Sequence, residues 1–521
     1  MEENITTVTE RKDYVFALLM FFCSGALTVA GIWSGFNGGW CVSFDITFIL
    51  LSVYLKKRSR KPGIFACMCG LLTLVISAGF VTSSAAETHF ILFIAMCITA
   101  AVWLTGLSGR KIPGGDTEPV SFALFIIGKV LGGVPSSVRK LFEVKNQKSK
   151  KVFQFILGAV CCIPVLCVVI PLLIDSDAAF EGLARNLTES FSERIAQFVI
   201  TILIFPIGLS VGFSLDKEDE EIKKSKAPKG LDTGFIFAFH LVLCLCYAVY
   251  LFSQMAYFFS PFSGILPEGY VYSYAEYARR GFFEMCAVTA INLGIILITL
   301  SFSRKKDGRM PVILSATSVF ICLFTLFMAG TATAKMVMYI GEFGCTTNRI
   351  YAEIFEAFVI LIFITIIIRI LTPRVCVLKA AVIYGAVLAA AMGILNVNGL
   401  IAEYNYTAYE SGKLPEIDVM YLSELGEDGV PYLIKLYESG DTDMKSDAKF
   451  ALTYIIDELY YMEFDGFNED DSWNGKIGDR IHGTVKEMSI PRARAYKLMD
   501  KYINDYPDCY TDIHPREDFL W

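Results

Sequence analysis

The sequence is poor in charge and in histidine for its length. Of its 521 residues, 19% are Asp, Glu, Lys or Arg, whereas soluble globular domains carry about 25%. It has four histidines, and none stands beside a serine or cysteine in a recognisable catalytic pattern. It has no Gly-x-x-x-x-Gly-Lys-Ser/Thr, no His-Glu-x-x-His and no Gly-x-Ser-x-Gly motif. The enzyme classes that these motifs define are therefore excluded.

The cysteines do not form a disulfide framework. Most of the 15 lie inside apolar stretches, where a free thiol behaves as a small apolar side chain. Cys67-x-Cys69 and Cys244-x-Cys246 lack the spacing and the second pair that a zinc site needs. We expect no metal and no other cofactor.

What the sequence has in excess is apolar residues, at 54% of the chain. They occur in blocks of about 20 residues, the length that crosses a bilayer as a helix. The fold class expected is an all-α polytopic bundle with a retained N-terminal anchor. We predict about eleven spans, at 13–33, 40–55, 63–82, 90–107, 152–174, 198–215, 234–259, 274–300, 311–333, 350–370 and 378–397.

The charges in the connecting segments predict the orientation. Counted over alternate connections, one side collects about 28 Lys and Arg and the other about 6. The positive-inside rule then places the N-terminus in the cytoplasm and the C-terminus outside. Anionic lipid is the expected partner of the basic inner face, and nucleic acid is not, because no stacking aromatics accompany the lysines.

The segment 120–142 suits a helix in the headgroup region, a re-entrant segment or a packed helix.

Two domains are expected, a membrane bundle at 1–402 and a soluble helical domain at 403–521. The second part holds about 26 Asp and Glu against about 12 Lys and Arg. Helix-spaced apolar residues predict helices within 418–439, 445–461 and 489–506.

Polar residues gather at the outer ends of four consecutive predicted spans. Ser273 and Glu276 form a capping box at the start of the eighth span. The candidate ligand-binding residues are Glu276, Arg279, Arg280, Glu284, Arg349, Glu353, Glu356, Asn396, Glu403 and Asn405. They indicate either a solvated site for a polar ligand or lipid headgroup, or an interhelical salt-bridge network that fixes packing. Catalytic residues cannot be assigned.

Three isolated features are weaker candidates for a functional site. Asp45 is either an ion-binding group or an interface residue. His240 fits a hydrogen-bonded helix contact better than a proton relay. Asp470-x-Ser472-x-Asn474-Gly475 begins like a calcium loop but has Ile481 where the loop needs a glutamate.

Four ordered motifs carry a family resemblance. They are Tyr274-Ala-Glu-Tyr-Ala-Arg-Arg-Gly-Phe-Phe-Glu284, Asn348-Arg-Ile-Tyr351, Ile401-Ala-Glu-Tyr-Asn405 and Asp418-x-x-Tyr-Leu-Ser-Glu-Leu-Gly-x-Asp-Gly-Val-Pro431. The chain resembles the bacterial multi-pass membrane proteins catalogued as domain of unknown function 4173, related to a 4153 group. The resemblance covers about residues 230–440 and implies a protein of the bacterial plasma membrane, with no reaction or ligand.

Three functions fit these observations. The first is transport or lipid-headgroup handling at the outer charged cluster. The second is a sensor or scaffold whose outer domain binds a partner. The third is a membrane-embedded transferase acting on a lipid-linked substrate, with Glu276 or Glu284 as base.

Overall fold

The chain folds into a helical bundle with a smaller helical unit at one end. The computed structural model describes residues 11–33, 37–56, 62–108, 118–142, 197–215, 232–254, 274–303, 310–463 and 489–505. Within them, ten helices are long and apolar enough to cross a membrane. They match ten of the eleven predicted spans, and the predicted span at 152–174 lies outside the described residues. The all-α, multi-pass prediction is confirmed.

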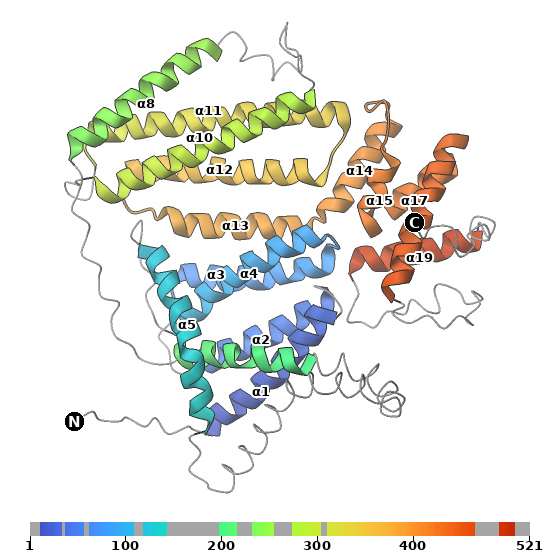
Figure 1. Ribbon diagram of the computed structural model, residues 1–521, viewed down its shortest axis with the longest axis horizontal. Helices are drawn as coiled ribbons and strands as arrows, with labels where there is room; N and C mark the ends of the chain where they lie inside the picture. The colour runs from blue at the N-terminus through green and yellow to red at the C-terminus, as the bar shows by residue number, and fades with distance from the viewer. Residues whose placement is uncertain are drawn as a thin grey trace, which may run out of the picture.

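The bundle has a central group of helices and two flanks (Figure 1). The centre holds α3 (Ile64–Thr82), α4 (Ala86–Leu107) and α13 (Val377–Ile394). One flank holds α8 (Thr233–Gln254), α10 (Tyr274–Phe302), α11 (Val312–Phe343) and α12 (Thr347–Leu371). The other holds α1 (Arg11–Thr28) with its π-helical turn η1 (Val29–Trp33), α2 (Gly38–Lys56) and the helix Gln197–Leu215.

Small residues bring the central helices together. Gly79 of α3 and Gly393 of α13 lie so close that a Cβ on Gly393 would stand 2.8 Å from the Gly79 Cα atom. Close by, Thr82 donates a 2.8 Å hydrogen bond to the Gly393 carbonyl oxygen. The last span is rich in alanine and glycine, and small residues of this kind allow such a close helix approach.

One helix, α5 (Glu118–Phe142), runs across the others instead of along them (Figure 1). The Lys140 ammonium group of α5 lies 2.8 Å from the Asp13 carboxylate of α1, and Tyr54 of α2 donates to that carboxylate at 2.9 Å. Ile126 of α5 is buried in the apolar core of the same flank. The segment is therefore a helix packed against this flank, and its depth in the membrane stays a prediction.

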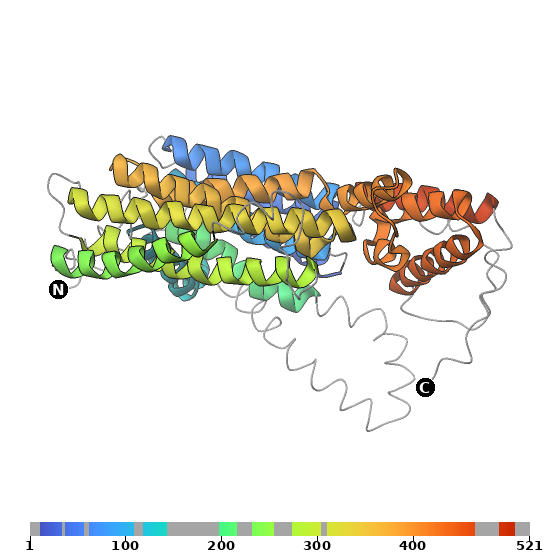
Figure 2. The same ribbon diagram turned by 90° about the horizontal axis from the view of Figure 1, so that it is seen from above.

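The C-terminal unit sits against one end of the bundle (Figures 1 and 2). It comprises α14 (Val397–Glu410), α15 (Val419–Glu424), η2 (Gly426–Asp428), α16 (Val430–Ser439), α17 (Thr442–Glu463) and α19 (Ile490–Asp505). Side-chain oxygens of Asp418, Asp441 and Ser489 accept backbone N–H groups at the starts of α15, α17 and α19. The helical prediction for this part is confirmed within the described residues.

A bend separates the last span from the C-terminal unit. The helix α13 ends at Ile394, and Asn396 takes the left-handed conformation with φ 50°. The next helix, α14, runs through residue 402 without a break. We call the bundle end next to this unit the domain end, and the opposite end, which carries Lys56 and Arg374, the basic end.

Candidate functional site

The candidate residues that the sequence analysis expected at the outer face lie at the domain end. The start of α10, the end of α11, the start of α12 and the end of α13 all reach it (Figures 1 and 2). At 1.5 Å per residue, the 29 residues of α10 and the 32 residues of α11 extend about 44 and 48 Å. The hydrocarbon core of a bilayer is about 30 Å thick, so both helices project beyond it.

The charged residues of α10 are exposed. Arg280 and Glu284 form an ion pair with 3.1 Å between Nε and Oε1, and both side chains are more than half exposed. Glu276 and Arg279 are also exposed on this helix. An exposed pair of this spacing stabilises a helix by about 0.3–0.5 kcal/mol. The contribution of this ion pair to fold stability is therefore small.

A lysine of α11 lies against α10. A Cβ atom on Gly281 would meet the Lys335 Cδ atom at 2.8 Å and its Nζ atom at 3.1 Å, so glycine makes room for the lysine stem. The charge of Glu284 acts on Lys335 and on Tyr250 of α8. The Glu284 carboxylate therefore lies within electrostatic range of groups on two neighbouring helices.

Two glutamates one turn apart on α12 lie deeper in the flank. Glu356 is 1% exposed, and its Oε2 atom accepts a 3.0 Å hydrogen bond from Thr333 of α11. The carboxyl groups of Glu353 and Glu356 interact directly with each other. Among the described residues, neither Oε1 atom has a hydrogen-bond donor, although both atoms are buried. Like charges in contact are strongly unfavourable, so such a pair needs a shared proton or a bound cation.

Further hydrogen-bonded layers follow toward the basic end. In the nearer one, Tyr247 of α8 donates to Asn292 of α10 at 2.6 Å, and Asn292 donates to Thr325 of α11 at 2.9 Å. In the next, His240 bonds Thr299 and Thr317, each at 3.0 Å. The structure thus supports the hydrogen-bonded interpretation of His240.

The spacing of these layers is regular. Thr317, Thr325 and Thr333 stand eight residues apart on α11, which is about 12 Å per step along the helix. We use the name polar file for the three hydrogen-bonded layers that contain Thr333, Thr325 and Thr317, together with Glu353 and Glu356 beside the first of them. The sequence did not reveal it, because the facing side chains come from helices far apart in the chain. The only signal was the repeat of threonine on α11.

Other candidate residues bind the turn between α11 and α12. Arg349 donates to the carbonyl oxygens of Phe343, at 3.2 Å, and Gly344, and its guanidinium group lies 3.8 Å from the centre of the Tyr339 ring. Gly344 has φ +76°, a conformation that favours glycine.

From the other side, Asn405 of α14 holds the same turn. It accepts a hydrogen bond from the Cys345 amide at 2.7 Å and donates to the Cys345 carbonyl oxygen at 2.8 Å. Burial raises the pKa of the Cys345 thiol to about 11. Asn405 and Arg349 thus fasten the turn to the C-terminal unit.

Asn396 takes part in a second fastening. Its Nδ2 atom donates to the Asp428 carboxylate at 2.6 Å, and Ser84, in the turn between α3 and α4, donates to the same carboxylate at 3.1 Å. The neighbouring Glu427 pairs with Arg492 of α19 at 2.8 Å. We call Ser84, Asn396 and Asp428 the latch, because they join the bundle, the bend after α13 and the C-terminal unit.

Burial dominates the electrostatics of the latch. Asp428 is 7% exposed, and burial raises the pKa of its carboxyl group to about 6, although the hydrogen bonds from Asn396 and Ser84 lower it. Asp428 is not among the ten candidate residues chosen from the sequence. It could have been chosen, because it belongs to the last of the four motifs that carry the family resemblance.

The ten candidate residues therefore do not form one cluster. Glu276, Arg279, Arg280 and Glu284 lie on the surface of α10, and Glu353 and Glu356 lie in the polar file. Arg349, Asn396 and Asn405 hold the junction, and Glu403 is exposed on α14.

The remaining candidates give no metal centre. Within the described ranges no three His, Cys, Asp or Glu side chains group as metal ligands, and the calcium-like segment from Asp470 lies outside those ranges. Asp45 accepts a long contact of 3.8 Å from the Cys41 thiol, and its Oδ1 atom has no hydrogen-bond donor among the residues described.

Comparison with known proteins places the chain in a family. The family model described as Domain of unknown function (DUF4153) matches residues 70–436, which include the polar file and the latch. No curated protein and no solved structure matches the chain.

Proposed function

The chain belongs to the DUF4153 family, whose function is unknown, and from its site we propose that it moves a charged or zwitterionic solute across the membrane together with protons. The observation that carries this proposal is a pair of carboxyl groups inside the flank: Glu356 is buried and accepts a hydrogen bond from Thr333, and the half-buried Glu353 interacts with it. Ionisable groups inside membrane helices are costly, and they commonly mark ion and proton pathways.

The proposed coupling ion is the proton. The pair avoids facing like charges when one carboxyl group holds a proton, and Thr333 then donates to the carboxylate oxygen. Cys286 of α10 also lies within reach of the charge of Glu356. Among the described residues, no lysine or arginine is among the groups whose charge acts on Glu356.

The proposed solute meets α10 first. Arg279 and Arg280 offer cations, and Glu276 and Glu284 offer carboxylates, on an exposed helix that projects beyond the hydrocarbon. Charges of both signs suit a zwitterion or a phosphorylated headgroup better than a neutral sugar. Membership in the 4173 family, the bacterial plasma membrane and the outward orientation of this end remain part of the proposal.

The test is proton movement driven by solute. Purified protein is reconstituted into vesicles that contain a pH-sensitive dye, and solutes are added by class: amino acids, sugars, nucleosides and glycerophosphate headgroups. We expect a charged or zwitterionic class to change the internal pH. Glu356→Gln should abolish the change, and Glu410→Gln, an exposed acid of α14, should leave it intact.

Two results would contradict the proposal. One is that no solute class moves protons through the wild-type protein. The other is that folded Glu356→Gln protein moves them at the wild-type rate. If solute movement requires sodium and no proton gradient, then the coupling ion is sodium and the proposal of proton coupling is wrong.

A second candidate function is a sensor or scaffold whose outer unit binds a partner. It is favoured by Phe450 and Tyr454 of α17, which are one turn apart and 55% and 52% exposed. A photo-crosslinking residue at 454 should then capture a protein of the cell envelope, whereas one at the exposed Lys445 should not. Equal capture at both positions would contradict this function.

A further inference from the structure

A groove lies between α2, α3 and α4 at the basic end of the bundle, far from the polar file. It has a volume of about 690 Å³. Sites for small molecules commonly have about 300–1,000 Å³ and are mostly apolar with a few placed polar groups. This groove fits that description.

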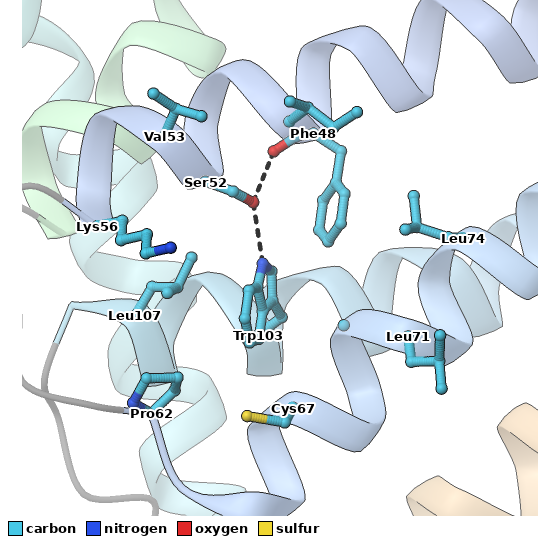
Figure 3. A pocket seen from close by; sticks show the side chains of 12 residues that line it. Phe48, Ser52, Val53, Lys56, Pro62, Cys67, Leu71, Leu74, Trp103 and Leu107 are labelled. Atoms are coloured by element: carbon cyan, nitrogen blue, oxygen red, sulfur yellow. Dashed lines mark hydrogen bonds between the residues drawn. The ribbon is translucent and has the colours of Figure 1, made fainter.

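Each wall of the groove is one face of a helix (Figure 3). Phe48, Ser52 and Lys56 recur every four residues on α2, and Trp103 and Leu107 do so on α4. From α3, Cys67, Gly70, Leu71 and Leu74 complete the lining. The α2 wall runs from Phe48 to Lys56, about 12 Å at 1.5 Å per residue.

The centre of the groove is an indole ring held in one position. Trp103 donates from its ring nitrogen to the Ser52 hydroxyl at 2.9 Å, and Ser52 donates to the Phe48 carbonyl oxygen at 2.8 Å (Figure 3). A Cβ atom on Gly70 would stand 2.7 Å from the Trp103 ring, so this glycine lets the ring lie against the backbone of α3. The shape of the groove is therefore set before any ligand enters.

A cation stands at the mouth of the groove. Lys56 is exposed and directs its ammonium group toward Trp103 and Leu107 (Figure 3). No carboxylate among the described residues forms a salt bridge with it. In the sequence it opens the run Lys56-Lys-Arg-Ser-Arg-Lys61, in which five of six residues are basic.

The apolar walls face outward from the bundle. Ile49 and Val53 of α2 and Leu71 of α3 are 53%, 50% and 66% exposed, and all belong to the lining. A ligand that fills this groove must be apolar along most of its length and must carry its negative charge at one end, beside Lys56. That combination describes an acyl chain that ends in a phosphorylated headgroup.

We propose that the groove between α2, α3 and α4 binds an anionic glycerophospholipid, with an acyl chain along Trp103 and the headgroup phosphate at Lys56. Charge complementarity and the open apolar wall both point to this occupant. The inference is independent of the solute transport proposed above.

Fluorescence quenching tests the site with the full-length protein. The protein is reconstituted into phosphatidylcholine nanodiscs that contain a minor fraction of bromine-labelled phosphatidylglycerol or, in parallel, of bromine-labelled phosphatidylcholine. Trp103→Phe identifies the part of the signal that comes from this ring. We expect the anionic lipid to quench Trp103 several-fold more strongly at equal fraction.

Variants at the mouth separate charge from packing. Lys56→Gln should remove the preference for the anionic lipid, Lys56→Arg should keep it, and Arg374→Gln, an exposed charge elsewhere at the basic end, should leave it unchanged. Equal quenching by both lipids in the wild-type protein would overturn the proposal. Displacement of the anionic lipid by soluble glycerol phosphate would overturn it as well, because the site would then recognise free phosphate.

Discussion

Thr333 on α11 donates a 3.0 Å hydrogen bond to Glu356 on α12, and this bond joins two membrane helices through a carboxyl group that is 1% exposed. The second oxygen of the same carboxyl group has no donor among the described residues, and the Glu353 carboxyl group one turn away interacts with the Glu356 group. Two carboxyl groups arranged in this way are stabilised by a shared proton or a bound cation.

Removing the donor is the first prediction. Thr333→Val keeps the shape of the side chain but removes the hydrogen-bond donor to the Oε2 atom of Glu356. A buried acceptor without a partner costs about 1–3 kcal/mol. We expect a lower midpoint of thermal unfolding in a fixed detergent.

The matched control is Thr331→Val. Thr331 donates only to the Met328 carbonyl oxygen of its own helix, at 2.8 Å, and is half-buried. Its replacement should cost less than about 1 kcal/mol. Equal losses in the two variants would show that Glu356 does not depend on Thr333.

The latch predicts a pH dependence of stability. The pKa of Asp428 is raised to about 6 in the folded protein from an ordinary 3.8, so between these values the folded state binds more protons than the unfolded state. Stability therefore increases as pH falls from above 6 toward 4, by at most about 3 kcal/mol. Thermal unfolding between pH 7.5 and about 4.5 measures the effect.

Asp428→Asn isolates the contribution of this one carboxyl group. The asparagine oxygen can still accept from Asn396 or Ser84, so the variant should be at least as stable as wild type at neutral pH and should lose that part of the pH dependence. Glu410→Gln should behave as wild type. An unchanged pH profile in Asp428→Asn would show that the titration of Asp428 does not contribute to the stability of the protein.

The crossing of α3 and α13 gives a packing prediction. In Gly393→Ala the new methyl group would stand 2.8 Å from the Gly79 Cα atom, where backbone must move, and overpacking of this kind costs about 1–3 kcal/mol. In Gly385→Ala on the same helix, the methyl group would meet only the Phe358 ring at 3.7 Å. The midpoint of thermal unfolding should fall in the first variant and stay the same or rise in the second.

Much of this fold is predictable from sequence because lipid permits few backbone arrangements. The third span was expected at 63–82 and is found at Ile64–Thr82, since basic residues and a polar turn bound its apolar run. The end of the last span was missed by three residues. The helix ends just before Asn396, which has a left-handed backbone and donates a hydrogen bond to Asp428, 32 residues later.

The site was predictable only in part. Outer charges on α10 and α12 could be placed by counting turns. What could not be predicted is which faces meet: the Asn292 bond to Thr325 and the Glu356 bond to Thr333 require knowledge of helix neighbours and rotations. Threonine on a membrane helix also bonds its own backbone, as Thr325 does to Ile321, so its presence alone indicates little.

Orientation gives a fourth prediction. Single cysteines placed at Glu284 and at Lys413 should react with a membrane-impermeant maleimide in intact cells, above the background of the native thiols. A cysteine at Arg374, at the basic end, should react only after the cells are opened. The opposite pattern would place the α10 charges and the C-terminal unit in the cytosol.

The most direct measurement of the central claim is the infrared spectrum of the protein at neutral pH, in the C=O stretching region of protonated carboxyl groups. The account predicts a band from the Glu353 and Glu356 pair that disappears in Glu356→Gln and persists in Glu410→Gln. If Glu356→Gln is folded and its spectrum in this region matches that of the wild type, then the pair holds no proton and the proposed coupling is wrong.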